Sequence, residues 1–132
     1  MFNFKNDYCY IAHENILNAM FNLKDEANEV YGLDKHSANA KELIKKHING
    51  VDVDIHFLVG GTSANKVVIT HALRPYEAVI SANTGHINVH ETGAITNKII
   101  TVPNVNGKIT IRGIKEVLSQ HTDEHMVKPR MV

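Results

Sequence analysis

The segment IHFLVGGTSAN, residues 55–65, has residue types that suit a phosphate group. Its apolar run stops at Gly60 and Gly61, and Thr62 follows where a helix is expected to begin. Glycines let a backbone approach a ligand closely, and the free amides and dipole of a helix N-terminus favour an anion. The pattern is neither a Walker loop nor a GxGxxG fingerprint, so a tight turn with Thr62 as an ordinary helix cap remains the alternative.

A second segment that could carry chemistry is NTGHINVHETGA, residues 83–94, where small, polar and imidazole groups follow a predicted strand. Ligands of open α/β sheets bind outside the carboxyl ends of the strands, so this segment and GGTSAN are expected to face the same crevice. The imidazole of His86 could lie flat on an aromatic ring there. The alternative is a capping loop in which a hydrogen bond of His86 serves stability alone.

The chain has nine histidines, and two pairs have helical spacing, His86 with His90 and His121 with His125. Either pair could present two imidazoles for zinc. Neither forms an HExxH motif, and Cys9 is the only cysteine, so the common structural zinc patterns and any internal disulfide are excluded. We therefore expect a solvated histidine stretch and no metal site.

Weaker candidates lie near the N-terminus. Asn6, Asp7 and Tyr8 are polar groups that could line a site, but their spacing favours an Asx turn.

The elements that must position these groups follow from apolar periodicity. Residues 12–23 and 40–48 have the spacing of two amphipathic helices, the second behind an Asp34 cap and ending at Asn49 and Gly50. Further along, strands and helices alternate, which predicts an α/β fold with a mainly parallel sheet. The predicted strands are 55–59, 78–80, 98–102 and 126–132; the predicted helices are 62–73 and 111–118, the latter capped by Thr110 after a turn at Asn106 and Gly107.

Composition bounds the class of protein. The chain has 132 residues, 43% of them hydrophobic, which suits one compact domain. Fourteen basic residues balance fourteen acidic ones, so nothing favours nucleic acid or an anionic membrane as partner. No apolar run approaches the about 18 residues of a membrane helix. A cytoplasmic location is expected, since the single cysteine fits a reducing compartment.

Six motifs, in this order and spacing, resemble the N-terminal part of the threonine aldolase and β-eliminating lyase family. They are FKNDY, Tyr31-Gly32, HFLVGGTSAN, LRPYEAVI, TGHINVHETGA and DEHMVKPRMV. The resemblance implies the aspartate-aminotransferase-like fold of pyridoxal-phosphate enzymes, with a three-layer αβα large domain that is truncated here. Residues 1–50 would then be a helical N-terminal region and residues 51–132 the start of the cofactor-binding domain.

The resemblance also implies roles for single residues. Gly61 and Thr62 would bind the cofactor phosphate, and His86 would stack on the pyridine ring. Asn6 stands where many members have the serine of a Ser-Asp-Thr motif that helps to hold the substrate carboxylate. Tyr31 would reach the site of a partner subunit, because such sites are built at the interface of a homo-oligomer. The resemblance matches Glu91 to an acidic residue of the family without giving it a role.

The implied activity is cleavage of a β-hydroxy amino acid to glycine and an aldehyde. The lysine that holds the cofactor, the aspartate for its ring nitrogen and the arginines for the substrate carboxylate are expected after Val132, so no catalytic residue is assigned here. We expect these residues alone to be inactive, to bind cofactor weakly, and to leave a strand edge unpaired. The alternatives are another β-eliminating lyase, a non-catalytic interaction or cofactor-binding module, and a histidine-based metal protein.

Overall fold

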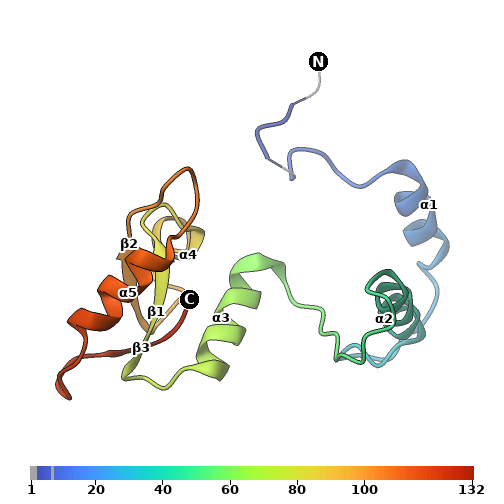
Figure 1. The fold of residues 1–132 in the computed structure, drawn as a ribbon. Coiled ribbons are helices and arrows are strands. Elements are labelled where there is room, and N and C mark those ends of the chain that lie inside the picture. Colours follow the sequence, from blue (N-terminus) through green and yellow to red (C-terminus); the bar gives the residue numbers. More distant parts are fainter. Residues whose placement is uncertain (1–2, 7) are drawn as a thin grey trace. The chain divides into compact units, whose positions relative to one another are not determined.

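The structure is a computed structural model that describes residues 3–6 and 8–132. The chain divides into two compact units, Met1–Ile55 and His56–Val132 (Figure 1). Each unit is described by itself below. None of the helices in the described part of the chain has the length and apolar character needed to cross a membrane.

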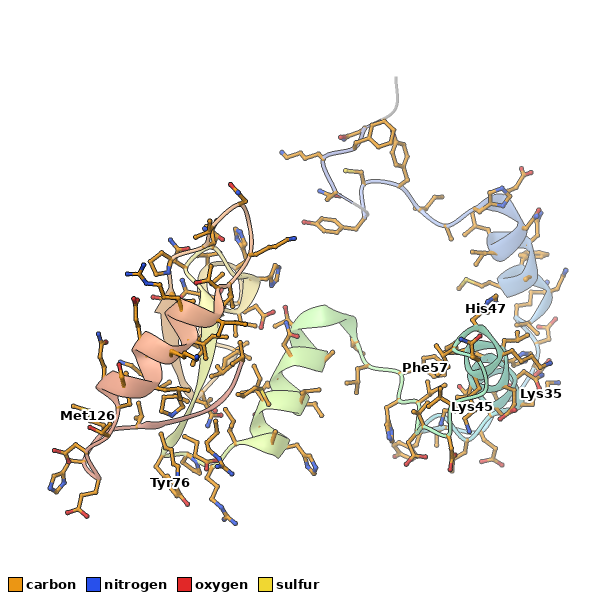
Figure 2. All side chains as sticks on the ribbon, in the orientation of Figure 1. Lys35, Lys45, His47, Phe57, Tyr76 and Met126 are labelled. Atoms are coloured by element: carbon orange, nitrogen blue, oxygen red, sulfur yellow. The ribbon has the colours of Figure 1, made fainter. Side chains whose placement is uncertain are left out.

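The first unit contains the helices α1 (Glu14–Asn22) and α2 (Lys35–His47). Asp34 caps α2, because its carboxylate accepts hydrogen bonds from the amide of Ser37 at 2.8 Å and from its hydroxyl at 2.6 Å. Both predicted helices and the Asp34 cap are therefore confirmed. Every residue of α1 and α2 is described, and none is buried. Figure 2 shows Lys35, Lys45 and His47 on the surface of α2.

The second unit alternates helices and strands, as the sequence predicts. The strands β1 (Glu77–Ala82), β2 (Lys98–Val102) and β3 (Lys128–Met131) form a parallel sheet in the order β2-β1-β3, with β1 in the centre. Thr110 caps the last helix, because its hydroxyl accepts a hydrogen bond from the amide of Gly113 at 3.1 Å. The helices of this unit are α3 (Gly60–Ala72), α4 (His86–Val89) and α5 (Ile111–Gln120).

Helices cover both faces of this sheet, because successive residues of a strand point to opposite sides. Val79 packs in one apolar cluster with Ile69 and Leu73 from α3 and its end. The next residue, Ile80, packs in a second cluster with Val117 of α5. The result is the αβα layering that the resemblance implies (Figure 1).

The prediction of a strand at residues 55–59 is wrong. The backbone from Val51 to Leu58 has no regular secondary structure, and α3 begins directly after it at Gly60. A strand forms when its amides and carbonyls pair with a neighbouring strand. Among the described residues the sheet has only β1, β2 and β3, and none of them pairs with this segment. The apolar, β-branched composition of this segment is therefore not sufficient to form a strand.

Different segments of the chain lie at the amino and carboxyl ends of the parallel strands. Tyr76 and Met126, labelled in Figure 2, lie just before β1 and β3, at the amino ends of these strands. At the carboxyl end of β1 the chain continues through Asn83, Thr84 and Gly85 into α4. The polar segment that the sequence singles out therefore leaves the sheet at the end where open α/β sheets bind their ligands.

Candidate functional site

The N-terminus of α3 is open on its outer side. Val59 occupies the capping position, and no side chain of the described residues makes a capping hydrogen bond there. Gly60 has φ of +77°, a conformation that glycine adopts without strain. Apart from the adjacent residues and the backbone of α3 itself, no described atom lies within 4 Å of where a Cβ would stand at Gly60 or Gly61. The amide of Gly60 donates to the carbonyl of Leu58 at 3.0 Å, so the amides of Gly61 and Thr62 are the ones available to an anion, which the helix dipole also favours.

The loop after β1 is held by the loop after β2. Asn83 donates its amide to the carbonyl of Val102 at 2.8 Å, and its side-chain oxygen accepts from the amide and the side chain of Asn104 at 3.2 and 3.0 Å. The amide of Gly85 donates to the carbonyl of Ala82 at 2.8 Å, which closes a tight turn. These bonds fix the start of α4, and with it the backbone of His86.

A buried carboxylate connects His86 to α3. The side chain of Glu91 has no exposed surface, whereas that of His86 is 63% exposed. One oxygen of Glu91, Oε1, lies 2.6 Å from the side-chain nitrogen of Asn65 and 2.9 Å from Nδ1 of His86. The other oxygen, Oε2, is buried without a hydrogen-bond partner among the described residues.

The charge of Glu91 follows from these contacts. The hydrogen bond from Asn65 lowers the pKa of the Glu91 carboxyl below its ordinary value, and the hydrogen bond and charge of His86 act in the same direction, while burial opposes them. Glu91 is therefore ionised at neutral pH. A negative charge inside this unit is held by one amide and one imidazole.

The structure brings together the segments GGTSAN and NTGHINVHE, as the sequence predicts. Asn65 follows Thr62 by three residues and so lies one turn further along α3. Through Glu91, His86 is two hydrogen bonds away from that turn. Gly61 and Thr62 consequently lie on the same helix as Asn65, the residue that connects α3 to His86 through Glu91.

Asn6 and Tyr31 lie in the first unit. The side-chain oxygen of Asn6 accepts from the amide of Tyr8 at 3.1 Å and from the thiol of Cys9 at 2.9 Å, which is the Asx turn that the spacing favours. Asp7 lies outside the described residues. Tyr31 is 95% exposed and has φ of 61°, and Gly32 after it has φ of 74°. The tyrosine therefore stands on a tight turn with its ring in solvent.

The loop that carries Tyr31 is closed by an ionic cluster. Glu26 lies 2.9 Å from Nε2 of His36 and 3.0 Å from Nζ of Lys35, on the first turn of α2. These two partners, His36 first, lower the pKa of the Glu26 carboxyl below its ordinary value. The cluster joins the residues before and after Tyr31.

The histidine pairs have different surroundings. The rings of His86 and His90 have centroids 5.4 Å apart and are tilted by 50°. His121 is engaged through Nδ1 with the carbonyl of Val117 at 2.7 Å. Among the described residues there is no group of three or more histidine, cysteine, aspartate or glutamate side chains placed to hold a metal ion.

Sequence reasoning missed Asn65 and left Glu91 without a role. The two residues are 26 positions apart, and no local pattern indicates that they touch. The available signal was an acidic residue inside an otherwise small and polar segment after a strand, which marks a carboxylate near the ligand-binding end of the sheet.

Enzymes that bind a phosphorylated ligand often have an αβα layer with a free helix N-terminus and with polar residues after the carboxyl ends of the parallel strands. The family model of the beta-eliminating lyases matches residues 7–132. The chain therefore belongs to the beta-eliminating lyase family, and the resemblance found in the sequence is confirmed.

Threonine aldolases are among the proteins to which the chain is similar. The low specificity L-threonine aldolase of Pseudomonas sp. (strain NCIMB 10558) is 32% identical over 107 residues, and that of Pseudomonas aeruginosa is 28% identical over the same length. Each match covers 77% of this chain and 31% of the relative. A solved threonine aldolase of Leishmania major is 41% identical, with a TM-score of 0.89, over 95% of this chain and 37% of that chain. The predicted α/β fold is thereby confirmed, and the chain spans about a third of the length of these relatives.

Proposed function

We propose that the chain is the N-terminal part of a pyridoxal-phosphate enzyme that cleaves β-hydroxy amino acids, threonine among them, to glycine and an aldehyde. Within it, Gly61, Thr62 and His86 bind the cofactor. The observation that carries the proposal is the Asn65–Glu91–His86 contact, in which a buried carboxylate links an exposed imidazole to the second turn of α3. The threonine aldolases among its relatives support the choice of substrate.

The first turn of α3 fits a phosphate group. The backbone at Gly60 and Gly61 carries no side chain, and the space around these Cα atoms is open. Amides at a helix N-terminus donate to phosphate oxygens, and the dipole favours their charge. Thr62 adds a hydroxyl that can donate a hydrogen bond to a further oxygen. The proposed phosphate contacts of these 132 residues are thus all made by the first turn of α3.

His86 fits the aromatic ring of the same cofactor. Its imidazole is exposed on one side and held by Glu91 on the other, so a flat face is available at a fixed position. Stacked aromatic rings contribute about 0.5–1.5 kcal/mol beyond the area that they bury. When bound, pyridoxal phosphate supplies the electron sink that accepts the bonding pair released from the amino acid.

Asn6 and Tyr31 are proposed to contact the substrate. The side-chain amide of Asn6 has N–H groups that can donate to the substrate carboxylate. Tyr31, with its ring in solvent on a tight turn, suits a contact with a second subunit in a homo-oligomer. We place this enzyme in the cytoplasm, as the sequence predicts.

Residues 1–132 by themselves are proposed to bind the cofactor without turning substrate over. The proposal assigns phosphate and ring contacts to these residues, and it assigns none of them to the covalent attachment of the cofactor or to protonation of its ring nitrogen. Affinity for pyridoxal phosphate is accordingly expected to be weak in the isolated chain.

The test compares the 132-residue chain with the polypeptide encoded by the complete locus that contains it. Both receive threonine and pyridoxal phosphate, and aldehyde release is followed by coupling it to an NADH-consuming alcohol dehydrogenase. We expect aldehyde from the locus product and none from the 132 residues. His86→Ala should remove most of that activity, and the control His125→Ala, at an exposed histidine near the other end of the sheet, should keep it. Cofactor binding without threonine cleavage by the locus product would contradict the proposed reaction.

A further inference from the structure

Glu91 is a fully buried carboxylate for which the proposed function has no use. Its side chain has no exposed surface, and its two contacts, Asn65 and His86, lie on different elements, α3 and α4. We infer that Asn65 and Glu91 are positioning residues for His86, which hold its imidazole as the Nδ1–H tautomer and leave Nε2 unprotonated on the exposed side. The inference rests on the proposed function for its purpose, since the ring so held is the one that would stack on the cofactor.

The tautomer follows from what each atom can donate. An ionised carboxylate only accepts hydrogen bonds, so a ring nitrogen 2.9 Å from Oε1 of Glu91 must carry a hydrogen. The lowered pKa of Glu91 agrees with its ionised form. With Nδ1 as the donor, the neutral ring has its lone pair on Nε2.

Asn65 fixes the direction of the carboxylate. Its side-chain nitrogen donates to the same oxygen that receives the imidazole, at 2.6 Å. Asn65 belongs to α3, a helix of 13 residues. The orientation of the imidazole is therefore fixed relative to the helix whose N-terminus is proposed to bind the phosphate. The two proposed contacts of the cofactor, phosphate and ring, thereby keep a constant spacing.

The unpartnered oxygen argues against a role in stability alone. Oε2 of Glu91 is buried and has no partner among the described residues. A buried charge with incomplete hydrogen bonding stabilises a fold less than a well-packed apolar side chain of similar size. The geometry that Glu91 imposes on His86 accounts for a carboxylate at this position.

The test reads the tautomer directly, by nitrogen-15 NMR of the histidine rings in the full 132-residue chain without cofactor. His86→Asn identifies the signal by its loss. We expect His86 in the wild type to be protonated at Nδ1. In Glu91→Leu the ratio of the Nδ1–H to the Nε2–H form should fall about tenfold, the lower limit for a hydrogen bond to a charged group, because the ring is more than half exposed to competing water.

A conservative variant separates positioning from charge. Glu91→Gln keeps an oxygen that Asn65 orients by donating to it, so the Nδ1–H form should persist. Glu77→Gln is the matched control: it converts another carboxylate of this unit, which accepts from the amide of Arg74 at 2.8 Å and does not touch His86. That variant should leave the His86 signal unchanged.

Three results would overturn the inference: a wild-type His86 protonated at Nε2, a ratio unchanged in a folded Glu91→Leu, or a Glu91→Gln variant that loses the Nδ1–H form. Circular dichroism establishes whether Glu91→Leu is folded, and where it is not, the wild-type and Glu91→Gln spectra decide. None of these spectra requires cofactor, so a chain that fails to bind pyridoxal phosphate refutes the proposed function and leaves this result standing.

Discussion

The turn that leads into His86 contains Gly85, and replacing this glycine should lower the stability of the fold. A Cβ at Gly85 would overlap the hydroxyl oxygen of Ser81 and lie 3.0 Å from the carbonyl oxygen of Ala82. Ser81 is buried, with 7% of its surface exposed, so its hydroxyl has little room to move aside. Gly85→Ala should therefore strain the turn between β1 and α4.

The magnitude follows from two opposing terms. Gly85 has φ of −64° and ψ of 142°, which alanine adopts without strain, so the stiffer unfolded chain alone would stabilise the variant by about 0.4–1 kcal/mol. Overpacking a tight site costs about 1–3 kcal/mol. We expect a net loss of about 1–2 kcal/mol in the free energy of unfolding, with the larger share due to the Ser81 hydroxyl.

The assay is urea unfolding of a double-mutant cycle made of Gly85→Ala, Ser81→Ala and both together. Removing the hydroxyl relieves the overlap, so Gly85→Ala should cost less in the Ser81→Ala background, with a coupling of about 1 kcal/mol. The contact with the Ala82 carbonyl remains, so relief is partial. Equal losses in both backgrounds would show that the strain does not arise at Ser81 and would refute the reasoning.

Three other changes test the second unit. Thr110→Ala removes the acceptor for the amide of Gly113 and should lower the free energy of unfolding, measured in urea, by about 1 kcal/mol. Thr110→Ser retains a hydroxyl acceptor and should retain most of that stability. Ile80→Val removes a methyl group from a residue that is 2% exposed and should also cost about 1 kcal/mol; no loss would contradict its place in the core. The pKa of Glu91 in the folded state lies below the ordinary 4.5. The stability that ionised Glu91 contributes is therefore complete above pH 4.5 and is lost as the pH falls through the pKa of the folded state. Urea midpoints should decline below pH 4.5, and less so in Glu91→Gln; an equal decline in both would count against an ionised Glu91.

The elements predicted correctly are those with a local signal. Asp34 and Thr110 mark their helices because a capping residue acts on amides two or three positions away. The sequence predicts strand β2 with the bounds it has, since a short apolar, β-branched run lies between Lys98 and Pro103. The segment from Ile55 to Val59 has similar composition and forms no strand, because pairing depends on a neighbour that a sequence pattern does not specify.

The candidate site was predictable in its parts and not in its connections. Glycines before a helix indicated Gly61 and Thr62, and an imidazole in a polar segment after a strand indicated His86. The bond between Asn65 and Glu91 joins residues 26 positions apart, and it exists because α3 and the segment after β1 fold against each other. Such contacts follow from tertiary packing, for which composition and periodicity give no signal.

The central claim is that the first turn of α3 and His86 form one binding site for a phosphorylated pyridine. The most direct measurement adds pyridoxamine phosphate, whose amine does not condense with surface lysines, to the labelled 132-residue chain and follows amide and imidazole shifts by NMR. The account predicts saturable shifts at the Gly61 and Thr62 amides and at the His86 ring, with the two amide shifts lost when pyridoxamine without phosphate is used. Shifts that are absent from these residues, or that appear equally at His125, would contradict it.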